Sequence, residues 1–339
     1  MMQLKLLDDI TQHYDHVYIS PHFDDAVVSC GGRIVDQITA GYSVLVVTVF
    51  TGVAATKNRA PKRTRRFIFD YRRRRKEDAA AMAALGVDFL WLGYPEILFR
   101  NRCSMFRYWP CYRHTPANGA LCASLVSGLK NVCRKTRCKY LVLPLAVGQH
   151  MDHQLVFQAG MDLLGSAPPP CQVLFYEDCP YMLFPYMLCY RMKITGGYHC
   201  GLPDTNEFLK ASYPSARKDA IDLLAGRPES KLRSMLLRAV SALFILIFGF
   251  YTQHLMKARK SLPGKRVFFS QEHCDVSRHF ERKLNAIMAY PSQLDRPVLQ
   301  RQQIRKILGA YSEFIGAPKN SFYERYWRVK LESAHELNP

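Results

Sequence analysis

The chain of 339 residues is 48% hydrophobic and 22% charged, a composition that excludes wholesale disorder and allows one α/β core with an additional element. Its 11 cysteines are an odd number without any C-x-x-C pair, so they indicate neither a zinc finger nor a regular disulfide framework. Reduced thiols and an N-terminus without an apolar leader predict a cytoplasmic protein.

The net charge of +19 is concentrated in two segments of the chain. Residues 57–76 contain eleven Lys or Arg and one acid, and residues 231–266 contain eight and no acid. Together these segments carry +18, so the remainder is nearly neutral. Such local charge predicts contact with phosphate on a lipid, a nucleotide or a sugar conjugate. No nucleic-acid-binding module is recognisable, so nucleic acid is the least favoured of these partners.

Short apolar strands alternate with helical patterns over the first half of the chain. Strands are predicted at 16–20, 43–50, 88–92, 140–144 and 172–176, and helices at 26–40, 72–85, 120–134 and 153–164. This alternation is typical of an α/β three-layer sandwich around a mostly parallel sheet. The Gly31-Gly32 pair lacks the G-x-G-x-x-G spacing, so a dinucleotide-dependent oxidoreductase is the weakest interpretation.

Polar clusters follow two of the predicted strands. His22, Asp24 and Asp25 come after the first strand, and His150 to His153 come after the strand that ends at Pro144. Because the carboxyl ends of parallel strands meet at one edge of a sheet, the clusters should converge there. Each cluster alone is also typical of a turn or a helix cap, but their combination favours an active site.

Two imidazoles and one carboxylate, from His22, Asp25 and His153, form the donor set of a catalytic zinc, and Fe(II) would accept the same set. Asp24 is then available as general base, and His150 could stabilise or protonate a tetrahedral intermediate. Asp152 could hold an imidazole in the required tautomer.

Several segments of the chain resemble the PIG-L/LmbE family of zinc-dependent N-deacetylases. SPHFDDAVVSCGG (Ser20–Gly32) is similar to the first family motif, whose usual form is A-H-P-D-D-E, and QHMDH (Gln149–His153) is similar to the second, H-x-D-H. Weaker similarity includes Arg73–Gly86 and Phe175–Tyr181 and runs from about residue 16 to about 295. The resemblance implies a Rossmann-like fold and hydrolysis of an N-acetyl group, typically on glucosamine within a larger conjugate.

The resemblance also implies roles for individual residues. By position His22, Asp25 and His153 match the metal ligands, Asp24 the base, and His150 the stabiliser of the transition state. Asp152 matches the residue that orients His150. Three residues are expected at the substrate: Arg74, which lies three positions before Glu77 as in the family, Glu96 and Arg100.

Three positions depart from the family pattern. Phe23 replaces the usual proline and Ala26 the usual glutamate, although neither position is assigned a bond to the metal. Gly148 stands where some members have a tyrosine that acts as an acid. We therefore expect the proton for the leaving group to come from His150 or Asp24.

The apolar run at residues 239–251 is shorter than the roughly 20 residues needed to span a bilayer. Since family-like segments lie on both sides of it, we favour an element at the membrane interface, flanked by cations; the alternative is a buried core helix. We therefore predict one catalytic domain from residues 1–230 and 267–300. Residues 231–266 form an insertion, and residues 301–339 form a helical extension.

These observations predict a metal-dependent hydrolase that removes an N-acetyl group from an amino sugar or related amino conjugate, in the cytoplasm and in contact with the membrane surface. The rival hypothesis is a non-catalytic binding protein of the same fold that uses its basic surface on anionic partners. The three intact ligand positions favour the enzyme.

Overall fold

The computed structural model describes residues 1–52, 71–100, 119–166, 169–183, 266–294 and 301–332, with 187–188, 191–192, 195, 197–200 and 239 between them. Within these residues the centre is a nine-stranded sheet in the order β1-β4-β3-β2-β5-β6-β9-β8-β7. The strands are β1 (Gln3–Leu4), β2 (His16–Ser20), β3 (Val44–Thr48), β4 (Asp88–Trp91), β5 (Tyr140–Pro144), β6 (Gln172–Tyr176), β7 (Gly197–Cys200), β8 (Arg266–Asp275) and β9 (Tyr323–Glu332).

The sheet is mostly parallel, as the sequence predicts. All neighbours from β1 to β6 run parallel, β9 runs antiparallel to both β6 and β8, and β7 runs parallel to β8. Every residue of β2 and β3 is buried, which is the pattern of strands covered on both faces. The α/β three-layer fold class is therefore confirmed.

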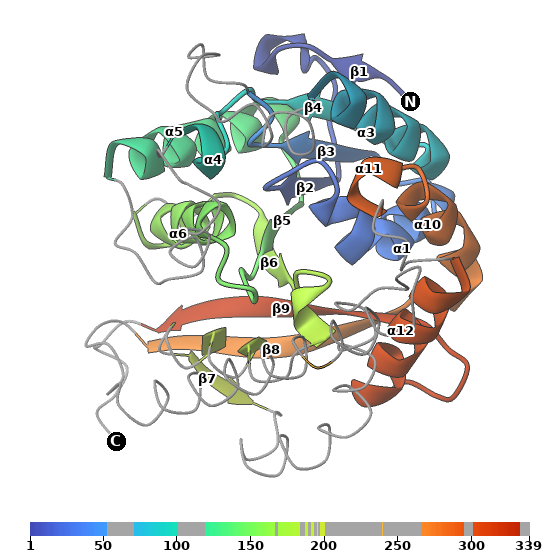
Figure 1. Ribbon diagram of the computed structural model, residues 1–339. Helices are drawn as coiled ribbons and strands as arrows, with labels where there is room; N and C mark the ends of the chain where they lie inside the picture. Colours follow the sequence, from blue (N-terminus) through green and yellow to red (C-terminus); the bar gives the residue numbers. More distant parts are fainter. Residues whose placement is uncertain are drawn as a thin grey trace, which may run out of the picture.

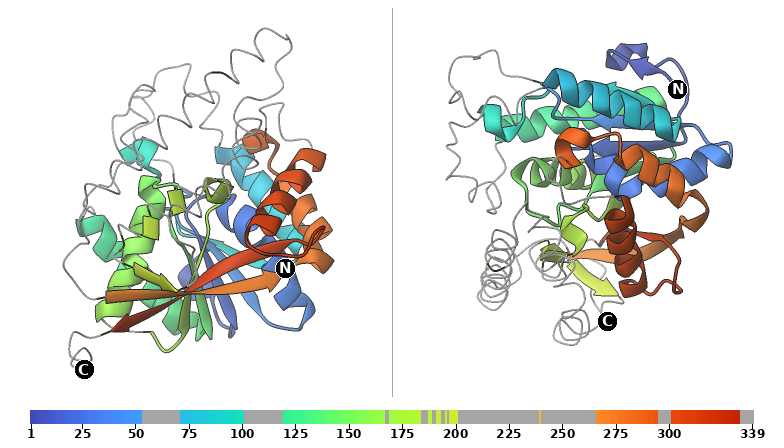
Figure 2. Two further views of the ribbon diagram at one scale, coloured as in Figure 1. Left: turned by 90° about the horizontal axis from the view of Figure 1, so that it is seen from below. Right: turned by 45° about the vertical axis from the view of Figure 1, so that its right-hand side comes forward.

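Helices cover both faces of the sheet (Figures 1 and 2). On one face lie α1 (Asp25–Thr39), α3 (Tyr71–Leu85) and α10 (Phe280–Ile287), and on the other lie α5 (Gly119–Thr136) and α6 (Met151–Ser166). The remaining helices are α4 (Ile97–Arg100), α11 (Pro291–Leu294) and α12 (Arg301–Phe314), with short 3-10 turns at Leu7–Asp9, Tyr181–Leu183 and Ser277–His279.

The hydrophobic core is divided by the sheet into two clusters. Successive side chains of a strand point to opposite faces, so Val17 and Ile19 of β2 pack with the α5 and α6 residues, whereas Tyr18 packs with α1, α3 and α10. The same alternation holds along β5, where Leu141 and Leu143 face α5 and α6 and Val142 faces α1. Both faces of the parallel strands are therefore sealed from water, and polar chemistry is left to the strand ends.

The Gly31-Gly32 pair of α1 serves close packing instead of nucleotide binding. A Cβ on Gly32 would lie 2.6 Å from Val276 Cβ and 2.8 Å from Glu324 Oε1. The Gly32 amide donates a hydrogen bond of 2.9 Å to that same carboxylate oxygen. Glycine thus lets α1 approach the β8–β9 pair closely enough for this contact.

The C-terminal part differs from the predicted helical extension. Its helix α12 is followed by β9, which lies in the central sheet between β6 and β8. Tyr326 and Trp327 are fully buried, which ties this strand to the core. The apolar run at 239–251 and the insertion at 231–266 lie outside the described residues, except for single positions. No helix in the described part is long and apolar enough to cross a membrane.

Candidate active site

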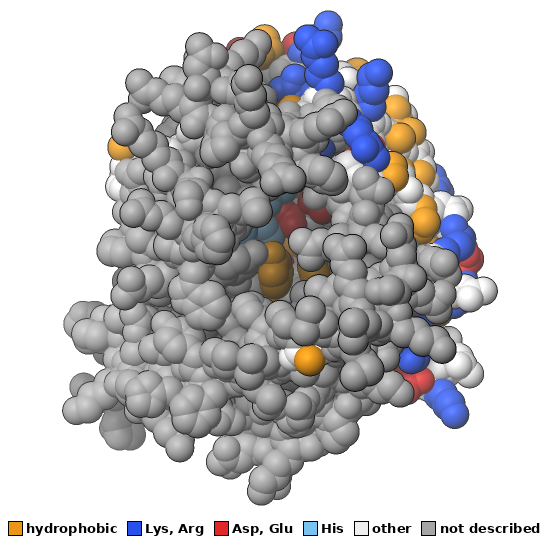
Figure 3. All heavy atoms as spheres, viewed as in Figure 1, with side chains coloured by type: hydrophobic (Ala, Val, Ile, Leu, Met, Phe, Trp, Pro, Cys, Tyr) orange, Lys and Arg blue, Asp and Glu red, His pale blue; other side chains and the backbone are white. Residues whose placement is uncertain are grey.

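The two polar clusters follow β2 and β5, which are adjacent parallel strands. The helices that follow them, α1 and α6, cover opposite faces of the sheet, so the clusters meet at the point where the winding of the chain reverses. Ligand sites of open α/β sheets lie at such switch points. Figure 3 shows histidine and acidic side chains at the bottom of a hollow in this face of the molecule.

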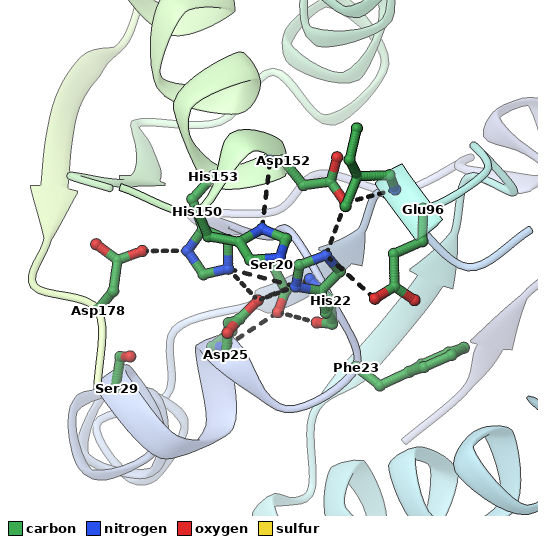
Figure 4. A network of polar contacts seen from close by, with 12 residues as sticks. Ser20, His22, Phe23, Asp25, Ser29, Glu96, His150, Asp152, His153 and Asp178 are labelled. Atoms are coloured by element: carbon green, nitrogen blue, oxygen red, sulfur yellow. Dashed lines mark hydrogen bonds and ion pairs between the residues drawn. The ribbon is translucent and has the colours of Figure 1, made fainter. Parts of the chain in front are cut away.

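Three side-chain atoms converge into a nearly equilateral triangle (Figure 4). His22 Nδ1 lies 3.3 Å from Asp25 Oδ2 and 3.3 Å from His153 Nε2, and His153 Nε2 lies 3.2 Å from Asp25 Oδ2. Ligands at about 2.0–2.1 Å from a tetrahedral zinc lie roughly 3.3 Å from each other. The triangle thus has the dimensions of one face of a tetrahedral metal site, with the fourth position open.

Carboxylates hold both imidazoles from behind. Asp152 Oδ2 lies 3.0 Å from His22 Nε2, and Asp178 Oδ1 lies 2.5 Å from His153 Nδ1. Both carboxylates are fully buried. Such partners fix the tautomer of a ligating histidine and leave its other nitrogen free for a metal. The donor set therefore fits a divalent cation such as zinc or Fe(II).

The position of Asp152 differs from the expectation that it orients His150. Its carboxylate accepts hydrogen bonds from His22, from the Ile97 amide at 3.0 Å and from Arg100 at 2.5 Å. Toward His150 it is the Asp152 backbone amide that donates, to Nδ1 at 3.3 Å. Asp152 therefore positions His22 of the triangle. Two donors from α4, the Ile97 amide and Arg100, hold the Asp152 carboxylate in place.

The pKa values reflect this concentration of charge. Burial alone would raise the pKa of Asp25, but the charge and hydrogen bonds of His153 and His22 hold it well below its usual range. Burial alone would lower the pKa of His153, but Asp25 and Asp178 outweigh burial and raise it to about 9. The hydrogen bonds of Asp152 and Asp25 likewise raise the pKa of His22 against the effect of burial. The site thus favours positive charge at its centre.

Asp24, the candidate base, directly precedes the triangle residue Asp25. It is the N-cap residue of α1, yet its side chain makes no capping hydrogen bond, so the simple interpretation as a helix cap does not apply. Burial and then repulsion by Asp25 raise its pKa. A carboxylate with a raised pKa holds a proton more readily than an ordinary aspartate, which suits general-base chemistry.

His150 also lies within reach of the triangle. Ring nitrogens of His22, His150 and His153 lie within 4.8 Å of one another, so His150 could in principle replace Asp25 as a ligand. Its Nδ1 accepts the Asp152 amide, and burial followed by the charge of His22 lowers its pKa to about 3. A neutral ring with Nδ1 engaged carries its proton on Nε2. His150 is thus better suited to donate a hydrogen bond than to bind the metal or carry a charge.

The three predicted substrate residues lie beside the triangle and contact one another or the site. Arg74 is buried, lies 3.4 Å from Glu96 Oε2 and packs over the Phe23 ring at 5.3 Å. Glu96 Oε1 lies 4.0 Å from His22 Nε2, so this carboxylate borders the metal ligands. Arg100 binds Asp152, and this contact gives it a positioning role that the sequence does not predict.

The space beside Gly148 is occupied by Tyr181. A Cβ at position 148 would lie 2.2 Å from Tyr181 Cγ, so no other side chain fits there while the ring is in place. The Tyr181 ring also meets the His153 ring edge-on, with 6.3 Å between centroids. The chain therefore brings an aromatic ring with a hydroxyl to this position from the segment after β6.

Asp178 and Tyr181 are functional candidates that the sequence reasoning did not assign. Both belong to the segment that follows β6, the third strand whose carboxyl end reaches the site. Asp178 also accepts the Val147 amide at 2.9 Å, which fixes the loop that carries His150. Two non-glycine residues of this loop, Ala146 and Gln149, have positive φ of 61° and 58°. The signal available in the sequence was a strand followed by Glu-Asp-Cys-Pro-Tyr, a third polar cluster at a strand end.

Comparison with known proteins agrees with this geometry. The family model for PIG-L, described as GlcNAc-PI de-N-acetylase, matches residues 17–164. This segment contains the three atoms of the triangle, Asp24 and His150. This segment is therefore similar to the PIG-L family, and the predicted resemblance is confirmed.

Two curated relatives share one description with each other. The 2'-N-acetylparomamine deacetylase of Niallia circulans is 27% identical over a match that covers 49% of this chain and 66% of the relative. The enzyme of the same description from Streptomyces fradiae is 28% identical, over 48% of this chain and 56% of the relative. The chain thus matches less than two thirds of the length of either relative.

Solved structures share the fold over nearly the whole chain. The zinc-inhibited form of a teicoplanin deacetylase has a TM-score of 0.61 and 18% identity, and the match covers 96% of this chain and all of that one. An A40926 pseudoaglycone deacetylase has a TM-score of 0.60 and 19% identity, with 95% and 99% coverage. These likenesses show that the overall fold is that of the deacetylases.

Proposed function

We propose that the protein is a metal-dependent hydrolase that removes the N-acetyl group from an amino sugar within a larger conjugate. The observation that carries the proposal is the triangle of His22 Nδ1, Asp25 Oδ2 and His153 Nε2, with edges of 3.2–3.3 Å. The match of residues 17–164 to the PIG-L family model and two curated relatives described as 2'-N-acetylparomamine deacetylases support it.

The triangle residues would hold zinc or Fe(II). When bound, such an ion supplies Lewis-acid chemistry, which polarises the acyl oxygen and makes a nearby water molecule more acidic. The neighbouring Asp24 carboxylate accepts the proton of the attacking water. Asp152 and Asp178 keep the two imidazoles in the tautomers that leave His22 Nδ1 and His153 Nε2 unprotonated.

Charge on the acyl oxygen and the leaving amine requires hydrogen-bond donors. His150, with Nδ1 engaged by the Asp152 amide, offers Nε2–H to the developing oxyanion. The proton for the amine can come from Asp24, after it has taken one from water, or from the Tyr181 hydroxyl. Tyr181→Phe removes only that hydroxyl, and a loss in kcat with an unchanged metal content would assign the donor to Tyr181.

The substrate is proposed to be anionic. The basic segment at residues 57–76 begins after Gly52, which pairs with Pro95 next to Glu96 of the site. Residues 57–70 lie outside the described residues, but Gly52, five positions before the segment, lies beside the active site through this pairing. A phosphate-containing lipid or nucleotide carrier would be attracted there. We likewise propose a cytoplasmic location with peripheral membrane contact through residues 231–266.

A substrate panel tests the proposed function. It consists of N-acetylglucosamine linked to phosphatidylinositol, to a nucleotide and to a peptide, together with 2'-N-acetylparomamine, and release of free amine is measured with and without a chelator. We expect chelator-sensitive release from at least one substrate, restored by zinc or Fe(II). A purified protein that holds no stoichiometric metal and releases no amine would favour the non-catalytic binding protein.

A further inference from the structure

Three cysteines converge at the end of the sheet opposite to the active site. Cys133 lies in the last turn of α5, Cys138 lies two residues before β5, and Cys171 directly precedes β6. Their sulfur atoms all lie within 4.8 Å of one another. They are free thiols.

The fold explains why segments far apart in sequence meet here. Tyr140 of β5 is the register partner of Gln172 of β6, so the residues just before these parallel strands lie side by side. A tight turn after α5, in which Arg137 has a positive φ of 51° and its amide donates to the Cys133 carbonyl at 2.8 Å, returns the chain toward Cys138. The strand β5, five residues long, lies between this cluster and the loop that carries His150 and His153. Its length is roughly 15 Å.

The surroundings of the three cysteines are compatible with binding of a soft metal ion. Cys133 and Cys138 are buried, whereas Cys171 is partly exposed and leaves an entry path. Residues 134–139 include four cations, of which Lys135 and Lys139 are paired with Asp8 and Asp15 at 2.8 Å. Sulfur ligands at about 2.3 Å from a tetrahedral zinc lie roughly 3.8 Å apart, and the three sulfur atoms already lie within 4.8 Å of one another.

We propose that Cys133, Cys138 and Cys171 form a second metal site, selective for a thiophilic ion such as zinc, whose function is structural. The ion joins the end of α5 to the starts of β5 and β6. Three thiolates leave the fourth position of a tetrahedral ion to water. Thiolates prefer zinc or Cu(I) to the harder divalent ions, so this site and the His–Asp triangle differ in chemistry.

Cobalt substitution distinguishes the two sites, because only thiolate ligands give an intense sulfur-to-cobalt charge-transfer band. We expect this band in the Co(II)-loaded full-length protein and in the Asp25→Ala variant, which lacks only the triangle. The Cys138→Ser variant should lose both the band and one equivalent of bound metal per chain. Cys122→Ser, a buried cysteine on the same helix, is the matched control and should keep the band.

Stability gives a second readout that is independent of deacetylase activity. Metal removal should lower the melting temperature of Asp25→Ala, in which only the cysteine site remains, but not that of the double variant Asp25→Ala/Cys138→Ser. Where Cys138→Ser fails to fold, Cys171→Ser replaces it, since its side chain is partly exposed. The proposal is overturned if the wild type shows no charge-transfer band, if Cys138→Ser retains the band, or if the purified protein contains a disulfide between two of the three cysteines.

Discussion

At the scale of single residues, Asp24 carries the most specific catalytic prediction. Asp24→Asn preserves the shape of the side chain but removes its ability to take a proton from water. We expect a fall in kcat of about 10²–10⁴-fold, the usual contribution of a general base, with metal content unchanged. Amine release and metal analysis on the same preparation measure both quantities.

The informative control for Asp24 is Asp25→Asn, which alters the adjacent carboxylate that forms one corner of the triangle. This variant should lose metal as well as activity. Near-normal turnover of the Asp24→Asn enzyme would contradict the assignment of Asp24 as base.

A substitution at Asp178 tests whether this carboxylate holds the His153 ring in the orientation needed for metal binding. Its carboxylate lies 2.5 Å from His153 Nδ1, the ring nitrogen that is not part of the triangle. Asp178→Asn can present an amide N–H to the ring and so favour the wrong tautomer. We expect a loss of metal affinity of roughly 10–100-fold, measured by competition with a chromophoric chelator. Unchanged affinity would show that His153 is held correctly without this carboxylate.

The sequence predicts the residues of the triangle more successfully than the hydrogen-bond partners that hold those residues in place. Spacing and residue type are enough to place His22, Asp25 and His153 together, since both loops follow neighbouring strands. The partner of Asp152 could not be predicted, because it depends on where α4 places the Ile97 amide and Arg100. Hydrogen-bond partners of buried carboxylates are decided by tertiary packing.

At the scale of elements, Asp78 links α3 to β4 and to Tyr290, which directly precedes α11. Trp91 donates to one carboxylate oxygen at 2.7 Å, and the Tyr290 hydroxyl lies 2.7 Å from the other. Tyr290 also lies 2.6 Å from the Phe23 carbonyl, and its single proton can satisfy only one acceptor. A protonated Asp78 donates to Tyr290 and resolves this conflict. Burial raises the pKa of Asp78 to about 7, which agrees.

This proton makes stability depend on pH. Between about pH 4 and 7 the unfolded chain ionises Asp78 while the folded chain keeps it neutral, so this group lowers stability as pH rises, by roughly 1.4 kcal/mol per pH unit at most. Asp78→Asn mimics the protonated form and should flatten the profile. Urea unfolding at several pH values in this window measures the slope. Equal slopes in the two proteins would show that Asp78 is already ionised.

Gly32 tests the close approach of α1 to the β8–β9 pair. A methyl group there would meet Val276 at 2.6 Å, so Gly32→Ala should destabilise the protein by about 1–3 kcal/mol despite the better helix propensity of alanine. Gly165→Ala is the matched control, because nothing lies within 4 Å of its Cβ position in α6. Chemical unfolding compares the two. Equal effects would contradict the packing explanation.

The elements themselves were predictable where they are buried on both faces. The continuous apolar runs at Tyr140–Pro144 and Gln172–Tyr176 match β5 and β6 residue for residue. The strand β9 was missed because YERYWRVKLE mixes charges with aromatic residues and shows neither an apolar run nor clean alternation. Its buried Arg325 is paired with Glu177 at 2.6 Å, a compensation that only the tertiary structure reveals.

At the scale of the whole molecule, the sheet separates two kinds of chemistry. Its carboxyl end gathers imidazoles and carboxylates around the triangle, and its amino end gathers the thiols of the cysteine cluster. The predicted division into one catalytic domain with an insertion stays a prediction, but β8 and β9 lie in the same sheet as β1 to β6. The active site at one end of the sheet is thus supported by a single sheet whose strands come from both the N-terminal and the C-terminal parts of the described chain.

The measurement that tests the account most directly is restoration of deacetylation by metal. The protein is stripped of metal, and amine release from an N-acetylated amino sugar is followed as zinc or Fe(II) is added back, in the wild type and in Asp25→Ala. We predict that activity of the wild type returns with one equivalent of metal that Asp25→Ala does not bind, and that this variant stays inactive. Full activity of the stripped wild type, or of metal-loaded Asp25→Ala, would contradict the central claim that the triangle holds the catalytic metal.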